Sequence, residues 1–244
     1  MVGAQNYTDV LSDRKLIAAF FNTLKYVAIV VPIQTFLAML IASVLNSNIK
    51  GKNTFRIIYF LPTLTSSSAL TLIFMFMFNQ EGLINMFLKV FGVQGKNWLD
   101  DVDFVLKVIM AMNIWSTVPF FMTIYLAGLQ DVPATQYEAA SIDGANAWQR
   151  FLYITVPNLR PITAFVVIMG LIGCFQVFDQ AYIVSKGTGG PGTATLTLVL
   201  LIYQYAFAGK PNMGRATALA FILALFIMGV TYLAKRFSKE ESLY

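Results

Sequence analysis

The stretch DVPATQYEAASIDGANAWQRFLYITVPNLRP, residues 131–161, is a long polar interruption in a largely apolar sequence. Pro133 suits the first turn of a helix with Asp131 capping ahead of it, because proline lacks the N–H that would have no partner there. Gly144 can end that helix in the left-handed conformation. Asn146 can cap a second helix. The stretch therefore predicts a short helix-turn-helix, which we call the 131–161 loop.

The second helix of this loop carries aromatic and aliphatic side chains, among them Trp148, Phe151 and Ile154. We expect it to end before Pro157, because a residue that precedes proline is disfavoured in the helical conformation. The loop thus combines small residues on its first helix with aromatic residues on its second.

The rest of the sequence is typical of a membrane protein. Of the 244 residues, 57% are hydrophobic and 12% are charged, whereas soluble domains carry about 25% charged residues. Five apolar segments are long enough to cross a bilayer. We therefore predict an all-α integral membrane protein, one domain over residues 1–244, with transmembrane helices at about 16–45, 57–78, 105–129, 161–184 and 215–234.

The composition excludes several classes of function. The sequence has no histidine and a single cysteine, Cys174, inside an apolar run. This excludes histidine-based catalytic triads, multi-cysteine metal sites and disulfides, so we expect no catalytic site and no metal. The net charge of +5 is spread along the flanks of the apolar segments. We therefore expect the chain to associate with a lipid bilayer and not with nucleic acid.

Two connectors carry shorter apolar segments. Residues 83–91 predict a short helix at the membrane surface, and Trp98 after it is a candidate interface anchor. Residues 195–208 are apolar but, at about 14 residues, too short to span comfortably. We expect them to form a re-entrant or interfacial helix.

The 131–161 loop resembles the EAA loop of ABC-importer permeases. The resemblance rests on an ordered set of residues: Glu138, Ala139, Ala140, Gly144, Ile154 and Pro157. One departure is Val156, where leucine is more usual. In that family the loop is cytoplasmic and docks onto a separate ATPase subunit. A pair of amphipathic helices lying on the membrane surface is the alternative interpretation.

A second point of resemblance lies between the last two predicted spans. The string from Phe178 through Gly-Gly-Pro at 189–191 to Ala208 is similar to an external loop of carbohydrate permeases. The glycines at 187–192 also fit the dinucleotide pattern G-x-G-x-x-G, but they follow an apolar span and no βαβ unit surrounds them. We interpret them as a turn.

The resemblance covers nearly the whole chain. It implies a MetI-like permease core with a cytoplasmic helix-turn-helix coupling loop, in a multi-pass subunit of a prokaryotic inner or plasma membrane. It also implies three kinds of partner: ABC ATPase subunits, a second permease subunit, and an extracellular or periplasmic solute-binding protein. Sugar-type members usually carry one more N-terminal span, so we expect a leading span to be missing here.

The sequence contains no Walker A pattern, G-x-x-x-x-G-K-[ST]. We therefore expect a transport subunit that is not an enzyme and binds no cofactor, with ATP hydrolysed on a partner subunit. The work must then arrive mechanically through the 131–161 loop, where small residues permit close approach and aromatic residues can act as anchors. The residues expected to couple to the ATPase are Tyr137, Glu138, Ala139, Ala140, Asp143, Gly144, Trp148, Phe151, Ile154 and Pro157.

Polar residues inside the predicted spans form a second candidate site. Sugar hydroxyls need amide and hydroxyl partners together with aromatic faces. The candidates for a substrate path are Gln34, Asn113, Ser116, Thr117, Gln176, Asp179 and Tyr182. Hydrogen bonding between helices is the alternative role for the polar ones. Lys25 and Asp179 are charges within spans, for which we also hypothesise an ion pair.

Two alternative functions remain open at this point. The solute of an importer of this type could be a polyol, glycerol phosphate or a peptide instead of a sugar. A secondary transporter that runs on an ion gradient belongs to a different class. It would predict more acidic residues within the membrane and inverted repeats, and neither is visible in the sequence.

Overall fold

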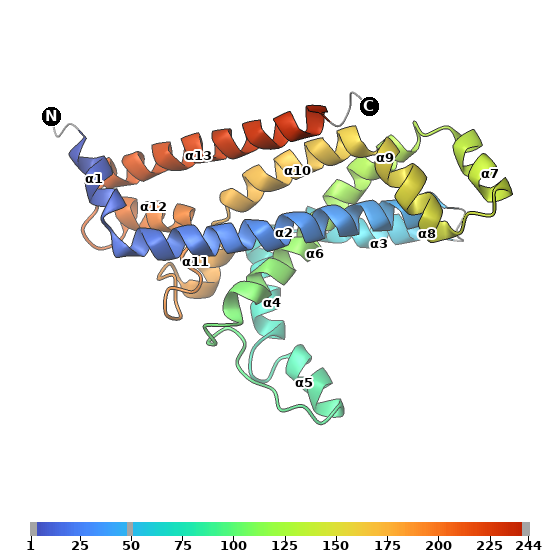
Figure 1. The fold of residues 1–244 in the computed structure, drawn as a ribbon. Helices are drawn as coiled ribbons and strands as arrows, with labels where there is room; N and C mark the ends of the chain where they lie inside the picture. The colour runs from blue at the N-terminus through green and yellow to red at the C-terminus, as the bar shows by residue number, and fades with distance from the viewer. Residues whose placement is uncertain (1–3, 48–50, 241–244) are drawn as a thin grey trace. The chain divides into compact units, whose positions relative to one another are not determined.

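The computed structural model describes residues 4–47 and 51–240, and these ranges contain helices and no strands (Figure 1). The long helices are α2 (Arg14–Asn46), α6 (Val105–Leu129), α10 (Arg160–Phe175) and α13 (Met213–Glu240). The shorter ones are α1 (Gln5–Leu11), α3 (Lys52–Leu64), α4 (Ser67–Met77), α5 (Leu83–Val90), α7 (Ala134–Ile142), α8 (Ala147–Arg150), α9 (Val156–Asn158), α11 (Asp179–Ser185) and α12 (Leu198–Phe207). A π-helical turn, η1 (Phe151–Thr155), joins α8 to α9.

Four stretches of the described residues are long and apolar enough to cross a membrane: Arg14–Asn46, Val105–Leu129, Arg160–Ser185 and Met213–Phe237. A fifth is a broken pair, Thr54–Leu64 and Ser67–Met77. The five predicted spans overlap these stretches. Since every backbone N–H and C=O needs a partner in hydrocarbon, helices of this length are one of the two structures that can cross it.

The break in the second stretch was not expected from its sequence, which predicted one span over 57–78. Ser66 has an extended backbone, and its hydroxyl accepts a hydrogen bond from the Ala69 N–H at 3.3 Å. Such a side-chain cap starts a new helix. Residues 57–78 therefore form the end of α3 and the whole of α4.

The fourth stretch is also interrupted. α10 ends at Phe175 and α11 begins at Asp179, although the sequence predicted one span over 161–184. In the break, the carbonyl of Val177 accepts a hydrogen bond from the Thr197 hydroxyl at 3.0 Å, in a buried position. This bond supplies a partner that the interrupted helix no longer provides.

The chain forms two compact units that alternate along the sequence. The first unit consists of residues 1–30, 65–113 and 171–229, and the second of residues 31–64, 114–170 and 230–244, within the described ranges. Long helices such as α2 contribute to both units.

The core of the second unit lies where α2, α6 and α10 pack together. Tyr125 and Leu159 are fully buried in it, and the Tyr125 hydroxyl donates to the Thr163 hydroxyl at 3.1 Å. Gly128 allows a close approach, because a Cβ at this position would lie 1.7 Å from Cδ1 of Ile162. Small residues at such crossings are the usual means of packing helices in membranes.

The core of the first unit holds the connector that leads to α12. The side-chain amide of Asn22 donates to the carbonyls of Thr193 at 2.7 Å and Leu196 at 3.1 Å. The buried Thr23 hydroxyl accepts from the Leu198 N–H at 3.0 Å. These bonds from α2 give hydrogen-bond partners to backbone groups of the irregular connector. Such partners are required wherever backbone is buried in a membrane. α12 covers most of the predicted 195–208 helix.

The first unit also ties α1 to α12 and α13. Asp9 pairs with Arg215 at 2.9 Å, and Asp13 accepts a hydrogen bond from the Tyr205 hydroxyl at 2.6 Å. Burial raises the pKa of Tyr205, and the hydrogen bond to Asp13 raises it further. Tyr205 therefore stays protonated and keeps this bond at neutral pH.

The connector between α4 and α6 is organised around Asn85, whose side chain is 1% exposed. Its amide nitrogen donates to the carbonyls of Asn79, Gln80 and Lys96, at 3.0, 3.0 and 2.7 Å. Its amide oxygen accepts from the Trp98 indole N–H at 2.8 Å. The predicted 83–91 helix is confirmed as α5. The indole N–H of Trp98, which was predicted as an interface anchor, is hydrogen-bonded within the connector to Asn85.

Lys96 continues this network outward. Its ammonium group pairs with the Asp101 carboxylate at 2.7 Å and lies 3.5 Å from the centre of the Phe104 ring. The hydrogen bond from Lys96 lowers the pKa of Asp101. The pair is therefore formed above the ordinary pKa of aspartate and is lost only when the pH falls below it.

Candidate functional site

The 131–161 loop forms the predicted helix-turn-helix, with α7 as its first arm and α8, η1 and α9 as its second. The start of α7 differs from the prediction. Pro133 stands at the N-cap with an extended ψ of 128°, and α7 begins one residue later, at Ala134. No side-chain hydrogen bond caps the helix, so the prediction of an Asp131 cap is wrong. Because proline already lacks an N–H, its ring can precede the helix without leaving a donor unpaired.

The end of α7 follows the prediction for Gly144, whose φ is +78°. The Gly144 N–H donates to the Ser141 carbonyl at 3.2 Å, and the Ala145 N–H donates to the Ala140 carbonyl at 2.9 Å. This pair of bonds is the Schellman arrangement. A Cβ at Gly144 would meet nothing within 4 Å, so the need for glycine comes from the left-handed backbone alone.

The start of α8 is confirmed as predicted. The Asn146 side chain accepts from the Gln149 N–H at 2.9 Å, and the Gln149 side chain accepts from the Asn146 N–H at 2.8 Å. The two residues form a capping box, which fixes where the second arm begins.

The second arm does not end before Pro157, as the sequence predicted, but continues to Asn158. It passes Pro157 through the π-helical turn η1, which occupies the five residues up to Thr155. A proline ring in a regular helix clashes with the carbonyl four residues earlier, here that of Tyr153. The wider π turn lies over this carbonyl, so the arm accommodates the proline instead of stopping.

Three side-chain hydrogen bonds hold the two arms together. The hydroxyls of Tyr137 and Thr155 are 2.9 Å apart. The Asn158 amide donates to the Gln136 side chain at 2.9 Å. The Arg150 guanidinium donates to the Ser141 hydroxyl, also at 2.9 Å. The two arms are therefore joined at three points along their length.

Of the residues in these three bonds, sequence reasoning singled out Tyr137 alone. The other five residues are polar and lie 9 to 22 positions from their partners. No local sequence signal indicates which residues pair at that distance along the chain. The residues missed were Gln136, Ser141, Arg150, Thr155 and Asn158.

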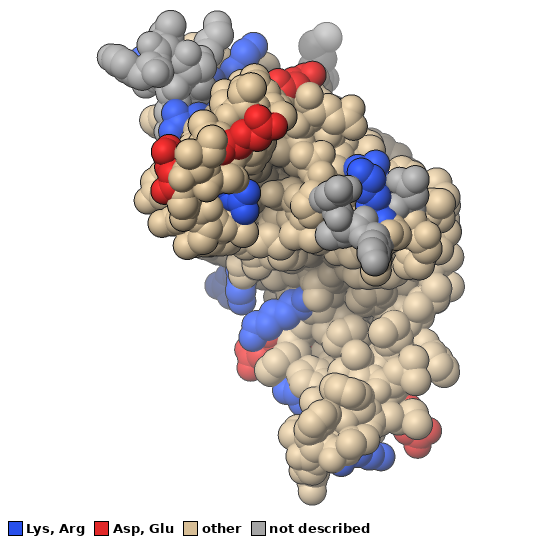
Figure 2. All heavy atoms as spheres, turned by 90° about the vertical axis from the view of Figure 1, so that its right-hand side faces the viewer, with Lys and Arg blue, Asp and Glu red and all other residues tan. Residues whose placement is uncertain are grey.

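Most of the α7 surface is exposed, although Tyr137 and Ala140 are half-buried. None of its residues is buried, and Ile142 at its end is 87% exposed. Glu138, Ala139 and Asp143 are exposed as well. Figure 2 shows the face of the molecule on which Figure 1 labels α7 and α8. Uncharged side chains cover most of this face, with acidic and basic ones scattered among them. The loop therefore offers a surface on which uncharged side chains predominate, with scattered acidic and basic groups.

The aromatic residues of the second arm divide into two roles. Phe151 is 7% exposed and belongs to the core of the second unit, whereas Trp148 is 52% exposed. Their rings stack with centres 5.3 Å apart. Trp148 thus remains available to a partner, while Phe151, predicted as a contact residue, supports it from below. Ile154 and Pro157 are half-buried.

A cleft of about 690 Å³ opens beside this stacked pair. It lies between the end of α2 and the second arm, with Val44, Tyr137 and Trp148 among its walls. A cleft of this size, with an aromatic side chain at its edge, can receive a side chain or short segment of another protein.

The acidic residues of the loop have no internal ion pair. The ion pairs that the structure describes within residues 4–47 and 51–240, Lys96–Asp101 and Arg215–Asp9, do not involve the loop. Glu138 and Asp143 therefore keep their carboxylates free for basic groups outside the loop.

The substrate-path candidates fall into both units. Gln34, Ser116 and Thr117 belong to the second unit, and the others to the first. Two of the candidates are in direct contact: the Thr117 hydroxyl donates to the Gln34 amide oxygen at 2.9 Å. For this pair the alternative role, hydrogen bonding between helices, is present in the structure.

Gln34 is 1% exposed, and its amide nitrogen is buried with no hydrogen-bond partner. Gly170 leaves room for it, because a Cβ there would lie 2.5 Å from this nitrogen. A buried donor without a partner costs free energy, so a group that accepts a hydrogen bond would be favoured beside it.

The remaining candidates occupy different environments. Asn113 and Ser116 are half-buried on α6, and Gln176 is exposed in the break after α10. The Tyr182 hydroxyl lies 3.4 Å from that of Tyr203.

The hypothesised ion pair between Lys25 and Asp179 is absent from the described residues. Both side chains are exposed, and the ion pairs of the described part of the chain involve other residues. Asp179 lies in the first turn of α11, where a negative charge is stabilised by the helix dipole without a cationic partner.

Residues 34–241 match the family described as binding-protein-dependent transport system inner membrane component. The chain is 33% identical over 242 residues to the lactose transport system permease protein LacF of Rhizobium radiobacter, covering 98% of this chain and 81% of the relative. It is 34% identical over 241 residues to the trehalose/maltose transport system permease protein MalF of Thermococcus litoralis, with the same two coverages of 98% and 81%. It is 33% identical to the arabinooligosaccharides transport system permease protein AraP of Bacillus subtilis, covering 97% of this chain and 76% of the relative.

Among solved structures, the fold is similar to that of a bacterial ABC transporter involved in the import of the acidic polysaccharide alginate. The TM-score is 0.82 at 22% identity, covering 98% of this chain and 84% of that chain. A bacterial alginate ABC transporter in complex with an alginate pentasaccharide-bound periplasmic protein gives a TM-score of 0.81 at 21% identity, covering 99% and 85%.

Proposed function

Because the chain belongs to the family of binding-protein-dependent transport system inner membrane components, we propose that it forms the translocation path of an ATP-driven sugar importer. Family membership makes it a multi-pass transport permease. The observation that carries the sugar assignment is the agreement among three of its relatives, which are permease proteins of lactose, trehalose/maltose and arabinooligosaccharide transport systems.

ATP hydrolysis then takes place on a separate ABC ATPase subunit, and this chain binds no cofactor. The absence of a Walker A sequence from the chain supports this division of labour. The further partners in this proposal are a second permease subunit and an extracellular or periplasmic solute-binding protein, in a prokaryotic inner or plasma membrane. The similarity to a transporter that was solved in complex with a periplasmic protein supports the proposal of a solute-binding protein as partner.

The 131–161 loop transmits the work of the ATPase. An element that transmits movement needs an exposed surface for the partner and a firm connection to the rest of the subunit, and α7 has both. Its residues are unburied, and three hydrogen bonds tie it to an arm whose Phe151 is rooted in the core. The surface that docks comprises Glu138, Ala139, Asp143 and Trp148, while Tyr137, Gly144 and Phe151 hold it in shape.

The substrate path remains a proposal for individual residues. Gln34 is the strongest of them, because its unpartnered amide nitrogen can donate to a sugar hydroxyl. This donor is buried in the present conformation, so substrate contact requires that the neighbouring helices move apart during the transport cycle.

Affinity purification of the full-length chain from its native membrane tests the proposal. We expect an ABC ATPase, a second permease and a solute-binding protein to co-purify, and calorimetry of the binding protein to show binding of a mono- or oligosaccharide. A binding protein that takes a polyol, glycerol phosphate or peptide would overturn the sugar assignment but not the importer. Purification without any ATPase would overturn both.

A further inference from the structure

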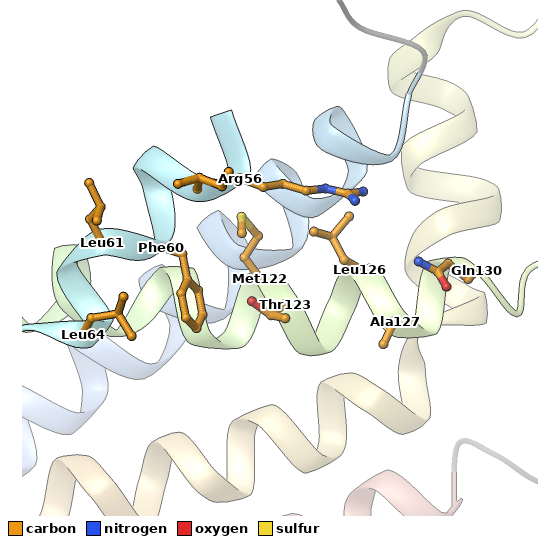
Figure 3. A pocket seen from close by; sticks show the side chains of 10 residues that line it. Arg56, Phe60, Leu61, Leu64, Met122, Thr123, Leu126, Ala127 and Gln130 are labelled. Atoms are coloured by element: carbon orange, nitrogen blue, oxygen red, sulfur yellow. The ribbon is translucent and has the colours of Figure 1, made fainter. Parts of the chain in front are cut away.

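An apolar groove of about 520 Å³ runs between α3 and α6 in the second unit (Figure 3). Phe60 and Leu64 of α3 face Met122 and Leu126 of α6 along it. Each helix lines the groove over about 12 Å, at 1.5 Å of rise per residue. Half of the hydrocarbon core of a bilayer is about 15 Å thick. The groove therefore has nearly the length of one membrane leaflet.

Two polar side chains of the groove, Arg56 and Gln130, lie at one end. A third, Thr123, lies among the apolar walls, and its hydroxyl donates to the Pro119 carbonyl at 2.9 Å. Figure 3 shows Arg56 and Gln130 at the same end, whereas Phe60, Leu61 and Leu64 lie toward the other. The Nε of Arg56 is buried and has no hydrogen-bond partner. Arg56 takes part in neither ion pair of the described ranges. A guanidinium with a buried, unused donor at the mouth of an apolar groove favours an anionic ligand.

A second positive charge lies close to this end of α3. Lys52 precedes Arg56 by four residues, which places the two on the same side of the helix. Gln130 directly follows α6 and precedes the 131–161 loop. If that loop is cytoplasmic, as proposed above, the charged end of the groove lies at the cytoplasmic surface, where bilayers carry anionic lipids.

We propose that this groove binds one anionic phospholipid, with an acyl chain between α3 and α6 and the phosphate at Arg56. Such a lipid matches both features of the groove. Its acyl chain is apolar like the walls, and its phosphate is negatively charged and can pair with the guanidinium. Basic pockets between transmembrane helices on the cytoplasmic side are suited to such headgroups. A helix of another subunit could also cover the apolar walls. It would then need an acidic side chain to neutralise the charge of Arg56.

A lipid-quenching experiment on the full complex tests this proposal. Leu64 is 73% exposed and lines the groove, so Leu64→Cys can carry an environment-sensitive fluorophore, with Cys174→Ser to remove the one native thiol. The complex is reconstituted into phosphatidylcholine vesicles that contain either brominated phosphatidylglycerol or brominated phosphatidylcholine. We expect phosphatidylglycerol to quench at a mole fraction about fivefold lower, the preference that one basic residue near a membrane surface confers.

Substitutions at the charged end separate a specific site from general lipid contact. Arg56→Gln should abolish the preference for phosphatidylglycerol, and Arg56→Lys should keep part of it. Arg160→Gln is the matched control, since Arg160 is exposed at the start of α10 and does not line the groove. It should leave the preference unchanged. A preference lost equally in Arg56→Gln and Arg160→Gln would overturn the proposal.

Two further outcomes would contradict it, and neither requires that the Arg56 variants fold. Equal quenching by the two brominated lipids in the chain with native Arg56 would show that bulk lipid alone fills the groove. No quenching by either lipid, together with capture of a neighbouring subunit by a thiol-linked photo-cross-linker on unlabelled Leu64→Cys, would show that a protein helix occupies it. The readout needs neither ATP nor transport, so its failure is distinguishable from failure of the proposed function.

Discussion

Gly144 and Asn146 show how much a single residue decides in the 131–161 loop. Each signal is local: a left-handed φ of +78° for the glycine, and two reciprocal hydrogen bonds between the asparagine and Gln149. Both positions could be predicted from sequence for this reason. Pro133 was placed one position too late, because proline generally prefers the first helical position, whereas here it stands at the N-cap.

We predict that Gly144→Ala destabilises the end of α7 by about 1 kcal/mol, the cost of a left-handed conformation for a residue with a Cβ. Hydrogen exchange of the α7 amides should then speed up by about fivefold. Gly173→Ala is the matched control, because Gly173 lies in α10 with a negative φ and open space around its Cβ. Unchanged exchange of α7 in Gly144→Ala would show that the left-handed residue does not hold the helix end.

We predict that Gln34→Leu changes the free energy of unfolding by about 1 kcal/mol or less, because removing an unpartnered buried donor offsets the loss of the hydrogen bond from Thr117. Gln34→Glu should lose several kcal/mol, because it buries a charge. Thermal unfolding in detergent measures both. If Gln34 also contacts the substrate, Gln34→Leu should lower sugar uptake while the complex stays intact. Full uptake by this variant would leave Gln34 a purely structural residue.

At the scale of elements, the boundaries set by local signals could be predicted and those set by distant contacts could not. Residues 105–129 were predicted as one span and form α6. The break after α10, by contrast, depends on a hydroxyl at Thr197 that lies 20 residues from the carbonyl it serves. The passage of the second arm through Pro157 depends on a π turn, for which the sequence carries no reliable signal.

The hydrogen bond between the two arms gives a prediction at this scale. Tyr137→Phe removes the 2.9 Å contact with the buried Thr155 hydroxyl and should loosen α7 by about 1 kcal/mol. The ratio of ATP hydrolysed to sugar transported should rise in the assembled importer, because a looser lever transmits less work. Tyr153→Phe is the control, since Tyr153 is 76% exposed. Equal ratios in the two variants would rule out a mechanical role for the bond.

For the whole molecule, the fold class and the family could be predicted because composition and an ordered set of loop residues carry them. The substrate path could not. Its candidates were chosen by residue type alone, and the structure distributes them over two units with different environments. Polar residues in a membrane bundle join helices as readily as they bind solutes, and Gln34 with Thr117 is an instance.

The docking surface gives a prediction for the assembly. Glu138→Lys reverses the charge of an exposed carboxylate that has no internal ion pair. It should weaken association with the ATPase subunit by about tenfold or more while the chain still inserts. Co-purification of the ATPase measures this, with Glu81→Lys in the connector before α5 as the control. Equal recovery of the ATPase with both variants would contradict the docking role and favour the alternative interpretation, a helix pair on the membrane surface.

The central claim is that this chain moves a sugar with work supplied by a partner ATPase. Its most direct test is uptake of labelled sugar into vesicles that contain the chain, its co-purified partners and the loaded binding protein. We expect uptake when ATP is supplied on the side of the ATPase subunits, and none with a proton or sodium gradient alone. Uptake driven by an ion gradient in the absence of the ATPase would contradict it.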